Sequence, residues 1–224
     1  MLRVGLLVPS SNTVMERDLH RGLAAFADVH TARMRLSDVT PEAEQVMLDR
    51  EALPAAERVA DVRPDVVVFG CTSASSLHGA AYDEAFRTHL AETVGVEVLG
   101  VLSSVLAELE GRGSVALFTP YVDALTSSIA ASLEAAGIPI ASSSGLGLGD
   151  NLQIGSLPPE QVVEEVGRMD LRGAAMLFCS CTNLRAYEAV GALQDRTGLP
   201  VVTSNQAVVS QLRSLAGLPT HTPR

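Results

Sequence analysis

The chain has 224 residues and a formal net charge of −10, and 47% of its residues are apolar while only 4% are aromatic. This length suffices for one large domain or two small ones, each with a buried core. The acidic balance and the lack of a basic cluster on any predicted helix face exclude a nucleic-acid-binding protein, because such a surface would repel phosphates.

The N-terminus and the cysteine count indicate the cellular context. The chain passes from Met1 directly into a strand-like run, with no charged leader and cleavable apolar segment. No stretch reaches the roughly 18 uninterrupted apolar residues that cross a bilayer. The three cysteines are odd in number and do not form a disulfide framework. We therefore expect a cytoplasmic protein with reduced thiols and no membrane partner.

Short, continuously apolar runs alternate with segments of helical period along the chain. Such runs are typical of parallel strands that are covered on both faces, which predicts an α/β fold. Thr13, with Glu16 three residues on, predicts the capping box of a first helix. Pro120 predicts the start of a later helix, and Gly137 predicts its end. The predicted strands are residues 4–8, 66–69, 96–101, 115–118, 174–178 and 201–202.

The chain repeats itself at an interval of about 110 residues. Residues 62–74 are echoed by residues 171–184, and their cysteines, Cys71 and Cys181, lie 110 positions apart. Residues 3–9 are echoed by residues 113–120, with an offset of 111 between their prolines. Agreement of two independent offsets favours duplication over chance similarity. We predict two pseudo-symmetric α/β halves, residues 1–110 and 111–224, with parallel sheets and a last helix free to pack back on the first half.

The two cysteines occupy equivalent positions at predicted strand ends. Ligands of parallel α/β sheets bind beyond the carboxyl ends of the strands, so both thiols should face one cleft between the halves. Backbone N–H groups at such a turn are expected to lower the pKa of a thiol and to suit it for nucleophilic chemistry. The alternative is that each is a small buried hydrophobe, as expected for Cys179, which lies inside its strand. No His or Cys motif predicts a metal site.

Three loops offer polar groups for an anionic ligand. Residues 8–13 supply hydroxyls and the amide of Asn12, which the predicted cap does not need. The equivalent loop of the second half presents the phenol of Tyr121, with a core-packed Tyr as the alternative. The glycine-rich run 145–155 does not follow the first strand and so does not predict a dinucleotide site. We interpret it as an irregular active-site loop that presents the amide of Asn151.

Taken in order, these motifs resemble the aspartate/glutamate racemase superfamily over nearly the whole chain. Within it they resemble the branch of maleate cis-trans isomerases, arylmalonate decarboxylases and ectoine-utilisation proteins. The motifs are Val8-Pro-Ser-Ser-Asn-Thr13, Cys71-Thr-Ser-Ala, Thr119-Pro-Tyr121, Gly149-Asp-Asn151 and Cys181-Thr-Asn-Leu.

The resemblance implies a fold and a set of site residues. The fold would be two flavodoxin-like halves that enclose the substrate, with Cys71 and Cys181 as the catalytic thiols. The carboxylate-binding side chains would be Asn12, Tyr121 and Asn151. Backbone N–H groups would add to them, from Thr72, Ser73 and Thr182. The family habit is compatible with a homo-oligomer.

The resemblance leaves several reactions open. Arylmalonate decarboxylases of the branch keep only the second cysteine, so the presence of both argues against decarboxylation. Glutamate racemases place an acidic residue in the first-strand loop, which here reads Ser10-Ser11-Asn12, although Asp150 could compensate. This favours a substrate without an ammonium group.

The leading hypothesis is therefore cofactor-independent isomerisation of maleate to fumarate. Cys71 would add to the alkene as a thiolate, and Cys181 would protonate the neighbouring carbon. The first alternative is a two-cysteine racemase of the aspartate or glutamate type. The second is a non-catalytic dicarboxylate-binding or accessory protein of a catabolic pathway.

Overall fold

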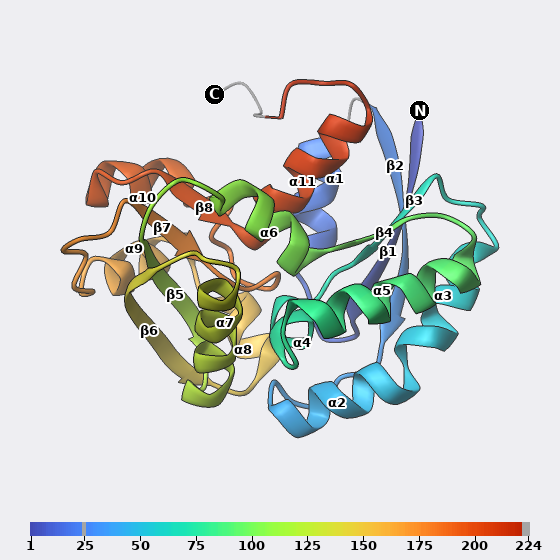
Figure 1. Cartoon of the computed structure of the whole chain (residues 1–224), viewed down its shortest axis with the longest axis horizontal. Coiled ribbons are helices and arrows are strands. Elements are labelled where there is room, and N and C mark those ends of the chain that lie inside the picture. Colours follow the sequence, from blue (N-terminus) through green and yellow to red (C-terminus); the bar gives the residue numbers. More distant parts are fainter. Residues whose placement is uncertain (24–25, 221–224) are drawn as a thin grey trace.

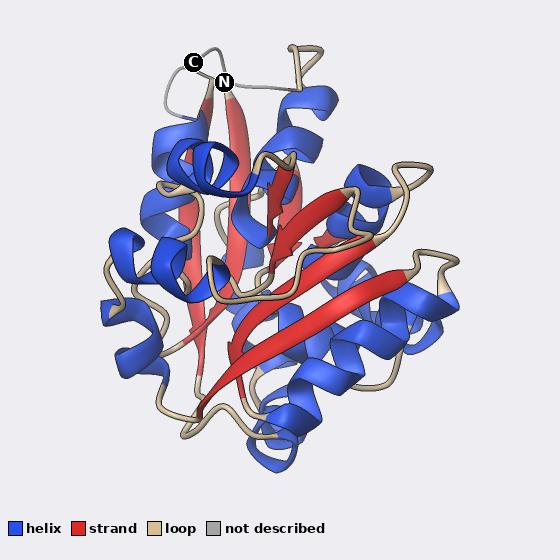
Figure 2. Cartoon of the chain, turned by 90° about the vertical axis from the view of Figure 1, so that its left-hand side faces the viewer, coloured by secondary structure: helices blue, strands red, loops and turns tan. Residues whose placement is uncertain are grey.

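The computed structural model describes residues 1–23 and 26–220, and it contains two four-stranded sheets whose strand pairs are all parallel. The two sheets lie in separate parts of the molecule, each with helices on its faces (Figures 1 and 2). The first has the order β2-β1-β3-β4 and the second the order β6-β5-β7-β8, which is the same order shifted by four strands. The strands are β1 (Leu2–Pro9), β2 (Ala27–Met34), β3 (Val66–Phe69), β4 (Val98–Gly100), β5 (Val115–Tyr121), β6 (Ile140–Leu148), β7 (Met176–Cys179) and β8 (Val201–Thr203).

The helices connect these strands and cover both sheets. In the first half they are α1 (Met15–Leu23), α2 (Pro41–Arg50), α3 (Ala52–Ala60), α4 (Thr72–Ser76), α5 (Ala80–Val94) and α6 (Val101–Leu109). In the second half they are α7 (Asp123–Ala135), α8 (Asn151–Ser156), α9 (Pro159–Val166), α10 (Val190–Thr197) and α11 (Ser204–Leu215). The central strands β1, β3, β5 and β7 are buried almost throughout because helices lie on both of their faces. The predicted α/β fold with two related halves is confirmed.

Strand register explains why the two halves present equivalent loops. Leu7 pairs with Phe69 in the first sheet, and Phe118 pairs with Cys179 in the second. The next N–H group then bonds back to the neighbouring central strand in each half. The Gly70 N–H donates to Leu7 O at 2.7 Å, and the Ser180 N–H donates to Phe118 O at 2.8 Å. Cys71 and Cys181 therefore follow at matching points beyond the two sheets.

Several local expectations were wrong. Strands β2 and β6 were not predicted, because they are only half-buried and lack a continuous apolar run, whereas the other edge strands, β4 and β8, are largely buried. The first part of the glycine-rich run is not a loop, since residues 145–148 belong to β6. Pro120 does not begin a helix but lies inside β5, and α7 begins two residues after that strand ends.

Helix α11 follows the last strand of the second sheet but packs against α1 and α6 of the first half. Figure 1 shows α11 beside both of these helices. The approach to α1 is close at Gly22, where an added Cβ would lie 2.7 Å from a γ-methyl of Val209. Gly22 is therefore the position on α1 that lets the last helix bind the first half. The division at residue 110 stays a prediction.

This close approach predicts the effect of Gly22→Ala. A Cβ at this position overlaps a stiff, buried Val209, so we expect a loss of about 1–3 kcal/mol in the free energy of unfolding. Gly191→Ala on α10 is the control, because an added Cβ there would have no other atom within 4 Å. That variant should gain roughly 0.5–1 kcal/mol from helix propensity. Urea unfolding of both variants measures the difference, and equal stabilities would contradict the packing argument.

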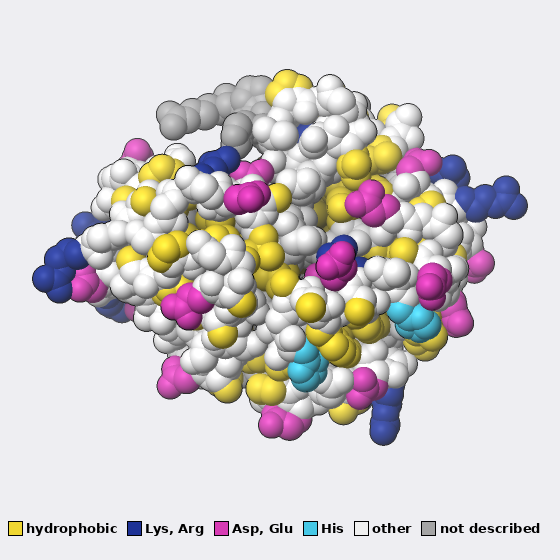
Figure 3. All heavy atoms as spheres, in the orientation of Figure 1, with side chains coloured by type: hydrophobic (Ala, Val, Ile, Leu, Met, Phe, Trp, Pro, Cys, Tyr) yellow, Lys and Arg dark blue, Asp and Glu magenta, His cyan; other side chains and the backbone are white. Residues whose placement is uncertain are grey.

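The surface shows charges of both signs. On the face in Figure 3, basic side chains lie mainly toward the edges and form no continuous basic patch. Within the described ranges, no helix is both long and apolar enough to cross a membrane.

Candidate active site

The Cys71 thiol lies at the junction between β3 and α4. Cys71 is the residue that precedes the first turn of α4, and it is 4% exposed. Its sulfur accepts a hydrogen bond from the Ala74 N–H and lies 3.7 Å from Ser73 Oγ. The strand end therefore fixes the sulfur against the turn that follows it.

The Cys181 thiol has a similar environment in the second half. The Asn183 N–H donates to Cys181 Sγ at 3.2 Å, the Leu184 N–H also contacts the sulfur, and the Tyr121 hydroxyl bonds it. Cys181 has a φ of 137°, a backbone conformation that residues other than glycine rarely adopt. The Ser204 hydroxyl accepts from the Cys181 N–H at 3.0 Å and helps to hold this conformation. Such strain costs about 1–3 kcal/mol and is typical of functional sites.

Both thiols titrate above the ordinary range, which corrects the expectation of lowered values. Burial is the largest cause at each sulfur, and the N–H donors offset it only in part. Burial raises the pKa of Cys181 to about 11, and it raises the pKa of Cys71 further. Cys181 is the better acid because Tyr121 and two backbone amides stabilise its thiolate. The two cysteines therefore differ in chemistry although they are related in position.

Hydrogen bonds between the halves join the two cysteine turns. Asn12 Nδ2 donates to Thr182 Oγ1 at 3.0 Å, and Thr182 Oγ1 donates to Gly70 O at 3.1 Å. On the other side, Thr72 Oγ1 donates to Ser204 Oγ at 3.0 Å. These contacts cross from one half to the other directly beside Cys71 and Cys181. The relative position of the thiols is thus set by buried polar contacts.

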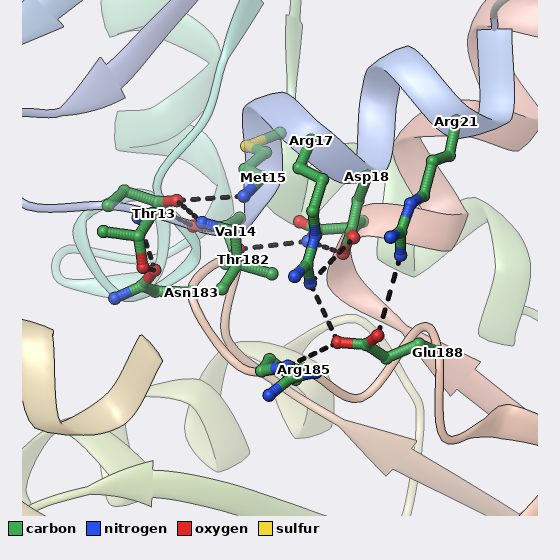
Figure 4. Close-up of polar contacts among 12 residues, drawn as sticks. Thr13, Val14, Met15, Arg17, Asp18, Arg21, Thr182, Asn183, Arg185 and Glu188 are labelled. Atoms are coloured by element: carbon green, nitrogen blue, oxygen red, sulfur yellow. Dashed lines mark hydrogen bonds and ion pairs between the residues drawn. The ribbon is translucent and has the colours of Figure 1, made fainter. Parts of the chain in front are cut away.

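An ionic cluster extends this junction toward the surface. Figure 4 shows Arg17 on α1 reaching Glu188, which Arg185 also contacts. The Arg17 to Glu188 contact is 2.8 Å long. Closer to the site, the Thr13 N–H donates to Asn183 Oδ1 at 2.8 Å. Helix α1 of the first half is therefore tied to the turn that follows Cys181.

A pocket with an empty volume of about 230 Å³ lies between the two cysteine turns. Every lining residue is buried. The lining comprises Pro9, Asn12, Leu36, Val39, Glu44, Cys71, Ser73, Tyr121, Asn151, Cys181, Thr182 and Asn183.

The pocket brings together most of the residues singled out from the sequence. Seven of the eight predicted site residues line it. The exception is Thr72, whose hydroxyl donates to Ser204 instead. Asn151 Nδ2 donates to Ser11 Oγ, and Asn151 Oδ1 accepts from Asn183. Ser11 lies in the turn after β1, and Asn183 lies in the turn that contains Cys181. The structure thus places the predicted groups together in one pocket.

The helix cap of α1 differs from the prediction. Asn12 Oδ1 accepts from the N–H groups of residues 14 and 15, each at 3.0 Å, so Asn12 is the capping residue. The Thr13 hydroxyl contacts Asn183 instead, and Glu16 pairs with Arg33. The cap leaves the amide nitrogen of Asn12 directed to the Thr182 hydroxyl of the other half. One residue therefore caps the helix and lines the pocket.

Sequence reasoning missed four lining residues. Leu36 and Val39 precede α2, Glu44 lies on α2, and Asn183 follows Cys181. The turn beyond β2 reaches the pocket because the Val39 N–H donates to Gly149 O of the second half at 2.8 Å. The placement of β2 was the missing step, since its carboxyl end directs this segment to the site. Of these four residues, only Asn183 could have been found from the sequence, because it directly follows the repeated Cys-Thr pair.

The remaining acidic and sulfur groups do not assemble a metal site. Across residues 1–23 and 26–220, no three His, Cys, Asp or Glu side chains are placed to share a metal ion. Asp150, considered as a partner for a substrate ammonium, caps α8 through the N–H groups of Leu152 and Gln153 and is exposed. It does not line the pocket.

Two parallel sheets of the same order, each with a cysteine beyond its third strand, form the arrangement expected of the aspartate/glutamate racemase superfamily. The model of the family described as arylmalonate decarboxylase matches residues 4–223, and the chain belongs to this family. The predicted branch of the superfamily is confirmed.

Relatives with the name maleate isomerase match nearly the whole chain. The maleate isomerase of Alcaligenes faecalis is 33% identical over 99% of this chain and 93% of its own length. That of Geobacillus stearothermophilus is 30% identical over 99% of this chain and 94% of its own length. The arylmalonate decarboxylase of Bordetella bronchiseptica is 26% identical over 96% and 90%, respectively.

Solved structures show the same fold. A variant of the maleate isomerase Iso from Pseudomonas putida S16, crystallised with maleate, has a TM-score of 0.93 at 24% identity and covers 99% of this chain and 94% of its own. A cysteine-to-serine mutant of the Nocardia farcinica maleate cis-trans isomerase has a TM-score of 0.91 at 26% identity and covers 97% and 94%, respectively. The latter contains a covalently bound succinylcysteine intermediate.

Proposed function

We propose that this protein is a cofactor-independent isomerase that converts maleate to fumarate through a cysteine adduct. The observation that carries the proposal is the shared pocket, in which one cysteine from each half faces the same small space. Relatives and solved structures that carry the name maleate isomerase support the assignment. Retention of both cysteines argues against decarboxylation as the reaction.

The proposed reaction begins with the Cys71 thiolate. Its sulfur bonds to one alkene carbon of maleate, and Cys181 gives its proton to the neighbouring carbon, where negative charge develops. The product is a succinyl thioether on Cys71 and a thiolate on Cys181. The former double bond is now a single bond and rotates. Cys181 then removes the proton again, the carbon–sulfur bond breaks, and fumarate leaves while Cys71 regains its thiolate.

The two sulfur environments support one part of this division of roles: the lower pKa of Cys181 favours its thiolate in the adduct, whereas the thiolate that starts the reaction must form on Cys71 against the pKa order. The acid must release a proton to carbon and remain a thiolate during the lifetime of the adduct. Cys181 has the lower pKa of the two thiols, with Tyr121 and the Asn183 N–H donating to its sulfur. A thiol of higher pKa forms a more nucleophilic thiolate, which suits Cys71 to carbon–sulfur bond formation.

The substrate carboxylates require hydrogen-bond donors, because the described residues that line the pocket include no Arg. We propose that Asn12, Tyr121 and Asn151 bind them with their side chains. The N–H groups of Thr72, Ser73 and Thr182 add donors at the two cysteine turns. These donors would stabilise the enediolate-like charge that forms as the sulfur adds.

Proton NMR in deuterated buffer tests the reaction directly. We expect maleate to be converted to fumarate without any added cofactor. Incubation with aspartate and glutamate then tests the racemase alternative, in which deuterium enters the α-position without alkene chemistry. Binding of dicarboxylates with neither conversion nor exchange would indicate the accessory protein and contradict the proposed isomerase.

We further propose a cytoplasmic location and a homo-oligomeric state. The three cysteines are free thiols in the structure, which suits a reducing compartment. Light scattering on the eluted protein measures the oligomeric state.

A further inference from the structure

A carboxyl group with no role in the reaction described above lies in the pocket. Glu44 on α2 is fully buried and lines the space between the thiols. Ser73 Oγ donates a hydrogen bond to Glu44 Oε1. Glu44 Oε2 is buried and has no hydrogen-bond partner among the described residues. A buried polar atom without a partner is costly, so its position in a ligand pocket indicates that a ligand atom completes its bonding.

Among the residues that the structure describes, no cation offsets a charge on Glu44. The titratable groups that face it are the two thiols and the Tyr121 phenol. Helices α3 and α4 pack against α2, but the charged residues of α3, Glu57 and Arg58, are exposed, and α4 has none. An isolated buried carboxylate is strongly disfavoured in such surroundings.

The carboxyl group is therefore neutral at neutral pH. Burial raises the pKa of Glu44 to about 8, although the hydrogen bond from Ser73 opposes the shift. Since Oε1 accepts from Ser73, the acid proton belongs on Oε2, the atom without a partner. The pocket thus contains a hydroxyl donor that lacks an acceptor.

We propose that Glu44 is a substrate-binding residue that acts as a neutral acid, with its Oε2 hydroxyl donating a hydrogen bond to one carboxylate of the substrate. The inference rests on the proposed function because it requires a doubly charged ligand. A hydroxyl that donates to a carboxylate forms a short, strong hydrogen bond. An ionised Glu44 would instead repel the dianion. A substrate ammonium would favour the ionised form, so Glu44 selects between these two ligand classes.

Calorimetric titration with succinate tests the proposal without turnover, because succinate has no double bond. At any pH at which Glu44 of the free protein is ionised, binding of succinate must be accompanied by uptake of a proton by Glu44. We expect uptake of roughly one proton per site at pH 9 and little uptake at pH 6.5, as measured in two buffers of different ionisation enthalpy. The apparent Kd should rise about tenfold per pH unit above about pH 8.

Glu44→Gln is the decisive variant, since its amide keeps a donor but cannot ionise. We expect it to bind succinate at pH 7, to take up no proton at pH 9, and to have a flat Kd across this range. Glu44→Leu lacks the donor and should bind weakly at every pH. Glu42→Gln is the matched control, because Glu42 lies exposed on the same helix, and it should behave as the wild type.

Thermal unfolding reports the charge state without any ligand. The folded-state pKa of Glu44 lies above its ordinary value of 4.5, so the folded protein binds the extra proton between about pH 4.5 and 8. Stability from this group is complete below that window and is lost as the pH rises through it. The Tm of the wild type should therefore fall relative to that of Glu44→Gln from pH 5 to 8.

The outcomes separate this inference from the proposed reaction. Fumarate formation together with succinate binding that takes up no proton would overturn the role of Glu44 and leave the isomerase in place. Proton uptake that persists in Glu44→Gln would also overturn it. Failure of any dicarboxylate to bind would contradict both proposals. Binding of amino acids that becomes tighter as Glu44 ionises would overturn the inference, because it would indicate a ligand with an ammonium group.

Discussion

Cys71→Ser is expected to abolish conversion of maleate to fumarate, with a loss of at least roughly 10³-fold in kcat/KM. A serine hydroxyl ionises far less readily than a thiol, so no nucleophile remains to form the adduct. The fold should persist because serine is close in size to cysteine and the Ser73 hydroxyl and the Ala74 N–H lie beside the replaced atom. Turnover is measured by the loss of alkene absorbance and by NMR.

Cys179→Ala provides the matched control for thiol loss. Cys179 is fully buried inside β7, two residues before Cys181, and does not line the pocket. Its replacement should lower the free energy of unfolding through a small cavity while activity per folded molecule is retained. Near-normal turnover by Cys71→Ser would eliminate the adduct mechanism.

Cys181→Ser is expected to trap a succinyl adduct on Cys71. Water can slowly protonate the carbon next to the new carbon–sulfur bond, but a serine hydroxyl is too weak a base to remove that proton again. The adduct therefore accumulates, and turnover stops at about one equivalent. A cysteine-to-serine mutant of the Nocardia farcinica maleate cis-trans isomerase holds a covalently bound succinylcysteine intermediate, which supports this expectation.

Intact-mass and peptide mass spectrometry measure the adduct and its position. The variant should gain the mass of one maleic acid, and the modified peptide should contain Cys71. Denaturation before addition of maleate is the control for non-specific alkylation, because free thiols also add to activated alkenes. An adduct on Cys181 in the Cys71→Ser variant, with none in Cys181→Ser, would reverse the assigned roles.

The two-half fold could be predicted from the sequence because duplication and burial both leave local patterns. Strands such as β3 and β7 are covered on both faces, so they form continuous apolar runs that end two residues before Cys71 and Cys181. The edge strands β2 and β6 were not predictable in this way. Unlike the edge strands β4 and β8, both are only half-buried, and this half-exposure removes the apolar run.

The candidate site likewise combines residues that could be placed from the sequence with residues that could not. Residues next to a strand end, such as Cys71, Cys181 and Asn12, could be placed from sequence because parallel sheets bind ligands at that edge. Glu44 could not, since it lies on α2 and reaches the pocket only through the course of β2 and the packing of α2 against α4. On sequence alone it resembles any other acidic residue of an amphipathic helix.

The sequence by itself determined the fold class, the internal repeat, the pair of thiols and the family, because each depends on local order along the chain. Only the tertiary structure decided the direction of the pKa shifts of the buried groups. A pKa depends on how much water the folded chain removes from around a group and on which groups replace it. The expected lowering of the pKa at Cys71 and Cys181 is outweighed by burial, and burial raises the pKa of Glu44 to about 8.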